Sequence, residues 1–302
     1  MLRALIKELR IHQWTKNALV AVPVVLAPGV PSIELIVRAL LAALAFSLCA
    51  SAGYVLNDLL DVEADRAHAT KKERPFASGA LPLKLGPPLF VALLLLGIGG
   101  AFLLLPLRFT LMLIAYFIAT ISYSLYFKRI LLLDVLLLAG MYTQRILAGG
   151  MATSIPISAW LLSFSMFFFT SLAFAKRYVE LNRLVGDGKI QNRNYYKVDL
   201  TMVGNMGPAS GYLAMLVFSL YVAESGVPQS VYQQPVLLWL AVPVLLYWIS
   251  RIWILTGRGQ MHDDPVRFAT KDPITLLAAV VMGAIFAAAR FAPDWVGRLF
   301  AS

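Results

Sequence analysis

The sequence predicts an all-helical integral membrane protein, and three observations support this prediction. Of the 302 residues, 60% are hydrophobic and 14% are charged, whereas a typical soluble domain is about 25% charged. The mean hydropathy is +0.75. Apolar runs of roughly 20 residues, each long enough to cross the hydrocarbon core as a helix, recur from one end of the chain to the other.

Nine of these runs are predicted to span the bilayer. The first is short and contains Pro23, so we expect it to be broken. The turns between the runs are compact and leave no room for a soluble domain, so we expect a single transmembrane domain over residues 1–302. The predicted spans are 17–30, 33–56, 86–105, 109–127, 131–152, 157–177, 205–223, 235–255 and 273–291.

The basic residues predict the orientation of these spans. With the N-terminus in the cytoplasm, most of the 26 Lys and Arg residues fall on cytoplasmic segments, as the positive-inside rule requires. An eight-span chain would distribute the basic residues over both sides of the membrane and would lose this asymmetry. We therefore attribute the net charge of +10 to topology, expect no nucleic-acid partner, and place the protein in the cell (inner) membrane. The single cysteine, Cys49, excludes a disulfide framework.

An acidic motif follows the second predicted span, in YVLNDLLDVEADRAHATKKERPFASG, residues 54–79. Asp58, Asp61 and Asp65 are three and four residues apart, so a continuing helix carries them on one face, with Asn57 beside them. Like charges at this spacing repel one another, but a divalent cation would attract all three. Mg2+ combines carboxylates with phosphate oxygens of a substrate. We therefore predict that these three Asp residues bind metal, against the alternative of a solvated helix end.

Basic residues follow the acidic motif directly. Arginine offers a planar fork that suits phosphate oxygens, and lysine offers a mobile point charge. Arg66, Lys71 and Arg74 lie near enough to the carboxylates in sequence to bind phosphate, whereas Lys72 and Lys84 are interpreted as topology charges alone. Carboxylates for Mg2+ and cations for phosphate, both at the cytoplasmic membrane face, suit a diphosphate substrate that meets a lipid.

A second polar cluster is predicted at the same depth, where the sixth span reaches the cytoplasm in FAKRYVELNR. Lys176, Arg177 and Glu180 are candidates for function, although Lys176 and Glu180 also fit a simple helix-surface pair.

Two further charges, Asp134 and Arg145, lie within the fifth span. A charge at membrane depth usually faces a protein interior or a water-filled cavity. These two are too far apart to pair, so each needs another partner.

Other polar residues gather at the cytoplasmic ends of the spans, and we expect a polar cavity that opens there. Near the N-terminus, RIHQWTKN places Lys16 and Asn17 at the membrane surface, where a plain interfacial anchor is the alternative. The last cytoplasmic loop, RGQMHDDPVRFATKDP, is either a lid or a turn. The candidates to line the cavity from the fourth span are Tyr123, Tyr126, Lys128 and Arg129.

At these residues the chain resembles the UbiA superfamily of intramembrane transferases. NDLLDVEAD at 57–65 matches the superfamily signature N-D-x-x-D-x-x-x-D, and RPFASG at 74–79 matches the R-P-x-x-S-G that follows it. Within the superfamily, the chain is most similar to the decaprenyl-phosphate phosphoribosyltransferase branch. The stretches that carry this likeness are RIHQWTKN, EADRAHATKKERP, LLLDVLLLAG with QRILAGG, AKRYVEL and DDPVRFATKD.

The resemblance implies a UbiA-type bundle that transfers 5-phosphoribose, with Mg2+, from phosphoribosyl diphosphate to a polyprenyl phosphate lipid, releasing diphosphate. By match to the first motif, Asn57, Asp58, Asp61 and Asp65 would hold metal and diphosphate. Catalytic roles are expected for Asp58, Asp61, Asp65, Lys176, Arg177 and Glu180. The expected substrate-binding residues are Lys16, Asn17, Asn57, Arg66, Lys71, Arg74, Tyr123, Tyr126, Lys128, Asp134 and Arg145.

Two other functions were weighed against this one. A UbiA-type prenyltransferase, which moves an isoprenoid from its diphosphate to an aromatic or other acceptor, would use the first motif equally well. Such members carry a second Asp-rich motif where this chain has KRYVE, and the extra cations here suit an acceptor that brings a phosphate charge. A transporter or lipid carrier is disfavoured, because we find no convincing internal repeat. A homo-oligomer is compatible with the sequence.

Overall fold

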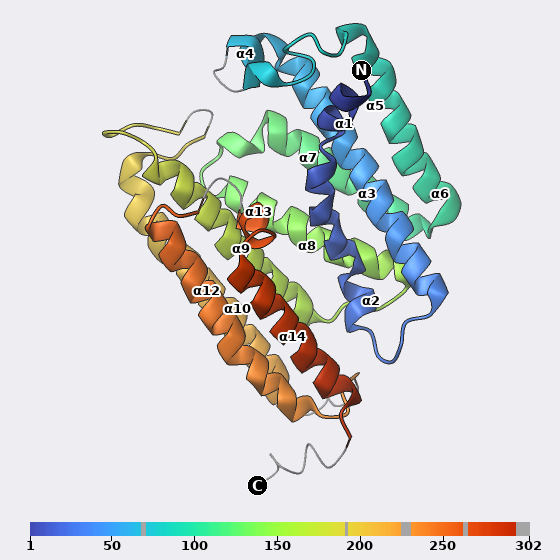
Figure 1. Ribbon diagram of the computed structural model, residues 1–302, viewed down its shortest axis with the longest axis vertical. Coiled ribbons are helices and arrows are strands. Elements are labelled where there is room, and N and C mark those ends of the chain that lie inside the picture. The colour runs from blue at the N-terminus through green and yellow to red at the C-terminus, as the bar shows by residue number, and fades with distance from the viewer. Residues whose placement is uncertain (68–70, 191–192, 225–230, 262–264, 294–302) are drawn as a thin grey trace. The chain divides into compact units, whose positions relative to one another are not determined.

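The computed structural model describes residues 1–67, 71–190, 193–224, 231–261 and 265–293 (Figure 1). The described residues are helical, with one isolated bridge between Lys189 and Tyr196, so the predicted all-helical class is confirmed. The α-helices are α1 Leu2–Leu9, α2 Val22–Leu26, α3 Ile33–Leu60, α4 Val62–Ala67, α5 Gly86–Leu94, α6 Gly100–Leu104, α7 Leu107–Leu125, α8 Leu133–Thr153, α9 Ala159–Asn182, α10 Leu200–Ala223, α12 Ala241–Gly257, α13 Pro265–Ala269 and α14 Pro273–Phe291.

Shorter helical turns connect and extend these helices. The segment η4, Leu95–Gly99, is a π-helical stretch between α5 and α6. The 3-10 helices are η1 Ile11–Ala21, η2 Lys71–Glu73, η3 Leu83–Leu85, η5 Phe127–Arg129, η6 Lys197–Asp199 and η7 Pro235–Leu240.

Eight stretches of the described residues are long and apolar enough to cross a membrane, and they coincide with the last eight predicted spans. This arrangement identifies a multi-pass membrane protein. The eight stretches are Ile33–Leu60, Leu83–Leu104, Leu107–Leu125, Leu133–Thr153, Ala159–Asn182, Lys197–Ala223, Pro235–Gly257 and Pro273–Phe291.

The first predicted span, 17–30, is not an α-helix of that kind. The 3-10 helix η1 ends at Ala21 and the five-residue helix α2 follows, with Pro23 in the first turn of α2. A 3-10 helix rises about 2.0 Å per residue and an α-helix 1.5 Å. The 11 residues of η1 and the 5 of α2 therefore extend about 30 Å, close to the thickness of the hydrocarbon core. The count of nine spans stays a prediction that this length supports.

Contacts divide the chain into two units, and the single domain expected over 1–302 stays a prediction. The first unit comprises Met1–Leu26, Pro31–Tyr126 and Gln144–Pro156. The second comprises Ala27–Val30, Phe127–Thr143 and Ile157–Ser302. Helix α8 contributes its first half to the second unit and its second half to the first.

In the first unit, α3 is the central helix and packs against η1, α5 and α7. From Trp14 onward, every third residue of η1 faces inward, as the period of a 3-10 helix dictates. Trp14 donates to Ser51 of α3 at 3.1 Å, Asn17 donates to Ser47 at 2.9 Å, and Val20 is fully buried.

A glycine of α8 fixes how closely η1 approaches that helix. A Cβ atom on Gly149 would overlap the backbone carbonyl oxygen of Val20, and backbone cannot move aside as a flexible side chain would. Glycine is therefore required at this contact for steric reasons.

The second unit is a stack of long helices in which α9 packs on α10, α10 on α12, and α12 on α14 (Figure 1). One serine ties three of them together. The Ser171 hydroxyl of α9 donates to the Gly207 carbonyl of α10 at 2.7 Å and accepts from the Trp253 indole of α12 at 2.9 Å. Satisfying each polar group internally in this way suits a bilayer, where water is absent.

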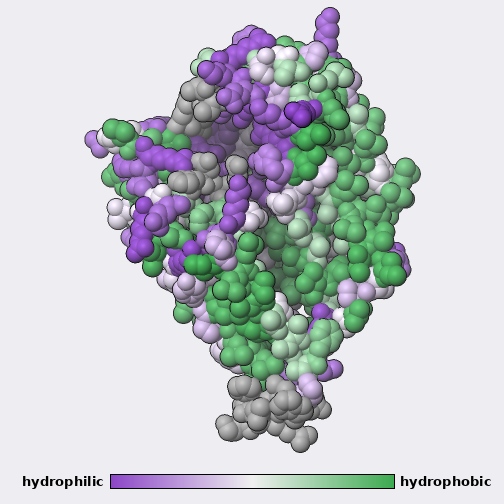
Figure 2. All heavy atoms as spheres, viewed as in Figure 1, coloured by the Kyte–Doolittle hydropathy of each residue, from purple (hydrophilic) through white to green (hydrophobic). Residues whose placement is uncertain are grey.

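The outward faces of several helices are apolar, as contact with lipid requires. Figure 2 shows hydrophobic side chains over the visible faces of α6 and α14. They include Phe102, Leu103, Leu104, Leu277 and Val280, each more than 60% exposed.

The close approach of η1 to α8 predicts that Gly149→Ala destabilises the protein. Overpacking against backbone should lower the free energy of unfolding by about 2 kcal/mol. Gly140→Ala is the matched control, because a Cβ atom there meets nothing within 4 Å. Unfolding in detergent should show a lower midpoint for Gly149→Ala alone, and equal midpoints for both variants would contradict the close packing.

The nine-span count predicts that residues 27–32 and the 71–79 loop lie on opposite sides of the membrane. Cysteines introduced at Val30 and Ser78, both exposed, can be labelled in cells with a membrane-impermeant maleimide. The natural Cys49 is fully buried and gives little background. We expect Val30→Cys to react in intact cells and Ser78→Cys only after permeabilisation. Identical behaviour of the two would remove the first span.

Candidate functional site

The acidic motif lies where α3 ends and α4 begins. The predicted continuing helix is wrong at one residue, because α3 stops at Leu60 and Asp61 takes a non-helical conformation with φ −97° and ψ 6°. The i to i−4 bonding nevertheless persists, since the Asp61 amide donates to Asn57 at 2.9 Å and the Asp65 amide to Asp61 at 2.8 Å. Asp58 and Asp65 are buried, while the Asp61 carboxylate is exposed.

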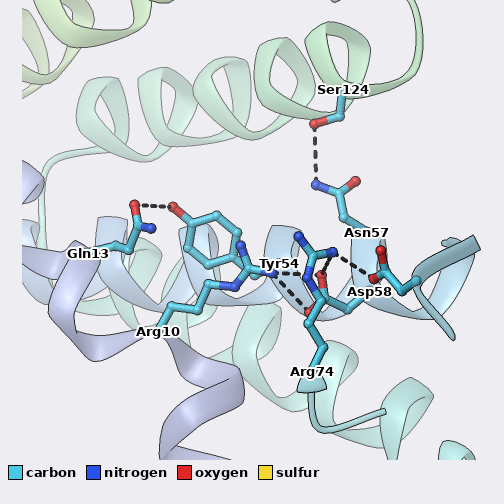
Figure 3. Close-up of polar contacts among 8 residues, drawn as sticks. Arg10, Gln13, Tyr54, Asn57, Asp58, Arg74 and Ser124 are labelled. Atoms are coloured by element: carbon cyan, nitrogen blue, oxygen red, sulfur yellow. Dashed lines mark hydrogen bonds and ion pairs between the residues drawn. The ribbon is translucent and has the colours of Figure 1, made fainter. Parts of the chain in front are cut away.

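Two arginines join the buried carboxylates (Figure 3). Nη1 of Arg74 donates to Asp58 Oδ1 at 3.0 Å and to Asp65 Oδ2 at 2.7 Å. Nη2 of Arg10 donates to both oxygens of Asp58, at 2.7 and 2.9 Å. The structure thus brings together three predicted residues, Asp58, Asp65 and Arg74, and adds Arg10, which the sequence analysis did not assign to the site.

The N-terminal helix α1 is fixed against this motif. Lys7 Nζ donates to the Glu73 carbonyl at 2.8 Å, and the Ser51 hydroxyl of α3 donates to the Leu9 carbonyl at 2.8 Å. Arg10 follows in a left-handed conformation with φ 49° and stacks over the Tyr54 ring at 4.6 Å (Figure 3). These contacts turn the Arg10 guanidinium toward Asp58.

Glu8 is a second residue near the acidic motif that the sequence pattern does not mark. Its side chain is 1% exposed, and neither carboxyl oxygen has a hydrogen-bond partner. Burial, followed by the nearby charge of Asp58, raises the pKa of Glu8 from 4.5 to about 7. In sequence, Glu8 is one charge among several on an amphipathic helix, so only the docking of α1 shows that it is buried.

The interior charge Arg145 is bound within the first unit, so the expectation that it needs a partner other than Asp134 is confirmed. Its Nε donates to Asn17 Oδ1 at 3.0 Å and its Nη2 to the Tyr116 hydroxyl at 2.8 Å. Asn17 is buried within the protein, so the alternative of a plain interfacial anchor does not hold for this residue. An amide can donate to Ser47 and accept from Arg145 at once, which explains the burial of Asn17.

The remaining predicted residues of the first unit lie around the acidic motif or on α7. Asn57 donates to Ser124 of α7 at 3.3 Å (Figure 3). Arg66 is exposed and donates to the Ala77 carbonyl at 3.2 Å, so it holds the 74–79 loop. Lys71 and Tyr126 are exposed, and Lys16 and Tyr123 are half-buried. The substrate roles of these residues stay predictions.

A second charged cluster forms in the other unit around Asp134, which is fully buried. Arg177 Nε lies 2.8 Å from Asp134 Oδ2, and Arg193 Nη1 lies 3.3 Å from the same oxygen. The Tyr195 hydroxyl donates to Asp134 Oδ1 at 2.8 Å. Burial and the Asp134 charge raise the pKa of Tyr195, so it stays a hydrogen-bond donor. The interior acid has therefore found partners, as predicted.

Glu180 belongs to the same cluster. Arg177 is bonded to it across one helical turn, and Arg193 Nε lies 3.5 Å from its Oε2. Arg193 and Tyr195 are not predicted from the sequence, because no motif marks the loop that folds back onto α9. Lys176 and Lys128 are both half-buried.

The last predicted cytoplasmic loop is described in part. His262, Asp263 and Asp264 lie outside the described residues. Asp272 caps α14 by accepting from the Thr275 amide at 2.8 Å, and Arg251 binds both its oxygens at 2.6 and 3.0 Å. The Arg251 bonds lower the pKa of Asp272. This end of the loop is a helix cap.

The acidic motif has the chemistry that a divalent cation requires. Among the described residues no three acidic, His or Cys side chains form a ready metal cage. However, a guanidinium nitrogen already sits between Asp58 and Asp65, which marks a place where positive charge is favoured. Buried carboxylate oxygens are the hard donors that Mg2+ takes, so these residues fit the ion.

Comparison with known proteins identifies the family of the chain. The model of the UbiA prenyltransferase family matches residues 18–276. The chain is 38% identical over 283 residues to the uncharacterized protein y4nM of Sinorhizobium fredii, covering 93% of this chain and 55% of that protein, so it spans about half of that relative's length. It is 30% identical over 295 residues to the decaprenyl-phosphate phosphoribosyltransferase of Mycobacterium tuberculosis, covering 96% of this chain and 95% of that protein.

A solved structure shares the fold. A UbiA homolog from Archaeoglobus fulgidus, bound to DMAPP and Mg2+, matches with a TM-score of 0.69 over 94% of this chain and 98% of that chain. The sequence identity is 16%, so this match shows the fold alone.

The buried Glu8 predicts a pH-dependent loss of stability that Glu8→Gln removes. The folded protein binds the Glu8 proton more tightly than the unfolded chain does, so stability falls as the pH rises from 4.5 to about 7. In EDTA, we expect the free energy of unfolding of Glu8→Gln to equal that of the wild type at pH 4.5. At pH 8 it should exceed the wild-type value by up to about 3 kcal/mol. Unfolding in detergent measures this difference, and a gap that does not change with pH would contradict the raised pKa.

Proposed function

The chain belongs to the UbiA prenyltransferase family, and from this premise we propose that it transfers 5-phosphoribose from phosphoribosyl diphosphate to a polyprenyl phosphate, with Mg2+ and with release of diphosphate. The relative from M. tuberculosis, similar over nearly the whole of both chains, carries the name of this activity. Its name alone does not separate this reaction from prenyl transfer, but the residues of the second cluster bear on that difference.

The observation that supports the proposal most is that Glu180 is bonded to two arginines. The prenyltransferase pattern has a second Asp-rich motif at this place, whose carboxylates would be directed to cations. Here the one carboxylate of KRYVE is held by Arg177 and Arg193. Both acids of this cluster, Asp134 and Glu180, are bonded to arginines rather than presented as a second set of metal ligands. Such a region suits an acceptor that brings its own negative charge, as a lipid phosphate does. An aromatic acceptor brings no such charge.

The acidic motif of the first unit would bind the leaving diphosphate. When bound, Mg2+ supplies positive charge beside that group, and Asp58, Asp61 and Asp65 would hold it. Arg10 and Arg74 already point into this place, and their planar groups are suited to phosphate oxygens. Charge that develops on the leaving group would thus meet groups positioned in advance.

The reaction itself needs no strong base. The bond between C1 of the ribose and the diphosphate oxygen breaks, and its electrons leave with diphosphate. A lipid phosphate oxygen forms the new bond to C1. Because a phosphate oxygen is already ionised near pH 7, no proton has to be removed from the nucleophile.

Prenyl transfer to an aromatic or other acceptor is the second candidate. The motif N-D-x-x-D-x-x-x-D at 57–65 favours it equally, because any diphosphate donor would use the same carboxylates. The two candidates differ in the donor's organic group and in the acceptor.

A donor comparison tests the proposal. Detergent-purified protein is incubated with Mg2+, a polyprenyl phosphate and phosphoribosyl diphosphate labelled in the ribose, and the label is followed into the organic phase. We expect Mg2+-dependent labelling of lipid with this donor. Transfer only from a labelled prenyl diphosphate to an aromatic acceptor would reject phosphoribosyl transfer in favour of the second candidate.

Substitution of Asp61 distinguishes an effect on transfer from an effect on the stability of the fold. Its carboxylate is exposed, so Asp61→Asn should leave the unfolding midpoint unchanged and reduce transfer on the order of 100-fold. Asp58→Asn should reduce transfer as well, but it weakens the bonds of Arg10 and Arg74 and should cost about 1–3 kcal/mol of stability. Glu63→Gln, at an exposed acid two residues away, is the control. Near-normal transfer by Asp61→Asn would remove that residue from the site.

A further inference from the structure

The buried cluster of the first unit contains one more acid than it can neutralise. Its acids are Glu8, Asp58 and Asp65, and its bases are Arg10 and Arg74. The two arginines bond to the two aspartates. No guanidinium is hydrogen-bonded to Glu8, whose oxygens have no partner.

The position of Glu8 is fixed by its neighbours in the chain. Lys7 is bonded to the Glu73 carbonyl, the Leu9 carbonyl to Ser51, and Arg10 to Asp58. Ala4 and Leu9 pack against the core that α3 forms with the 76–81 segment. The residue between these anchors cannot move out to water without undocking α1, so its carboxyl group stays within electrostatic reach of Asp58.

A purely structural role does not explain this acid. Buried carboxylates in folded proteins are paired or hydrogen-bonded, because an unpaired one costs several kcal/mol. Other positions of α1, such as Arg3 and Lys7, are exposed, and a charged side chain there avoids the cost of burial. An unpaired acid at 1% exposure, within electrostatic reach of Asp58 and Asp65, is instead expected where a cation binds.

We propose that Glu8 is a cation-binding carboxylate of this site, which joins Asp58 and Asp65 around one divalent cation as that ion displaces Arg10 and Arg74. Three carboxylates offer the oxygen donors and the negative charge that a hard divalent ion requires. The displaced arginines remain close and are released toward phosphate oxygens of the donor. The inference rests on the divalent cation of the proposed function, and it is independent of which organic group the donor carries.

Binding of Mn2+ to the full chain tests this role without any substrate. Mn2+ accepts the same carboxylate and water ligands as Mg2+, and its electron paramagnetic resonance signal distinguishes free from bound ion. We expect saturable binding of about one Mn2+ by the wild type, weakened at least tenfold in Glu8→Gln. Glu8→Asp keeps the charge and should recover part of the affinity. Glu63→Gln, which removes an exposed charge nearby, should bind as the wild type does.

Three outcomes would overturn the inference. The first is Glu8→Gln binding Mn2+ within twofold of the wild type, which would leave Glu8 outside the ion's ligands. The second is an equal loss in Glu63→Gln, which would assign the effect to general surface charge. The third is a wild type without saturable binding. The donor comparison is a separate experiment from Mn2+ binding. Phosphoribosyl transfer can therefore be rejected while Glu8 is shown to bind the ion, and the role of Glu8 can be rejected while phosphoribosyl transfer is observed.

Discussion

The bond network of Arg74 is the interaction on which the candidate site depends. Asp58 and Asp65 are buried like charges on one helical face, and without a cation between them they would repel each other. One nitrogen of Arg74 reaches both carboxylates, and Arg10 takes the remaining side of Asp58. These bonds hold the 74–79 loop, the end of α3 and the N-terminal helix in one place. The protein thereby holds two buried acids together around a positive charge.

The interior charge Arg145 follows the same rule at a different depth. A charge within a membrane span must find partners inside the protein, because the bilayer offers none. Arg145 is bonded to Asn17 and Tyr116, and Asn17 is bonded in turn to Ser47. The charge is thus dispersed over three helical segments of one unit. Asp134 meets the same requirement in the other unit through Arg177, Arg193 and Tyr195.

The sequence predicted those parts of the molecule that a local pattern determines. The eight spans and the joint orientation of Asp58 and Asp65 follow from the spacing of residues. The need of Asp134 and Arg145 for separate partners follows from the cost of a buried charge. Glu8, Arg10, Arg193 and Tyr195 were missed because each enters its cluster through tertiary docking. The burial of Asn17 was missed for a related reason, since its pattern beside Trp14 is also typical of an interfacial anchor.

The 3-10 form of η1 has a consequence for length. Each residue of such a helix rises about 0.5 Å more than in an α-helix, so the 11 residues of η1 reach about 5 Å further than an α-helix would. Arg10 is attached to Asp58 at one end of η1, and Val20 is seated against Gly149 at the other. If η1 were an α-helix, the distance between Arg10 and Val20 would be about 5 Å shorter. Either the bond of Arg10 to Asp58 or the contact of Val20 with Gly149 would then be lost. The 3-10 form of η1 therefore sets the distance at which Arg10 meets Asp58 when Val20 is packed against Gly149 of α8.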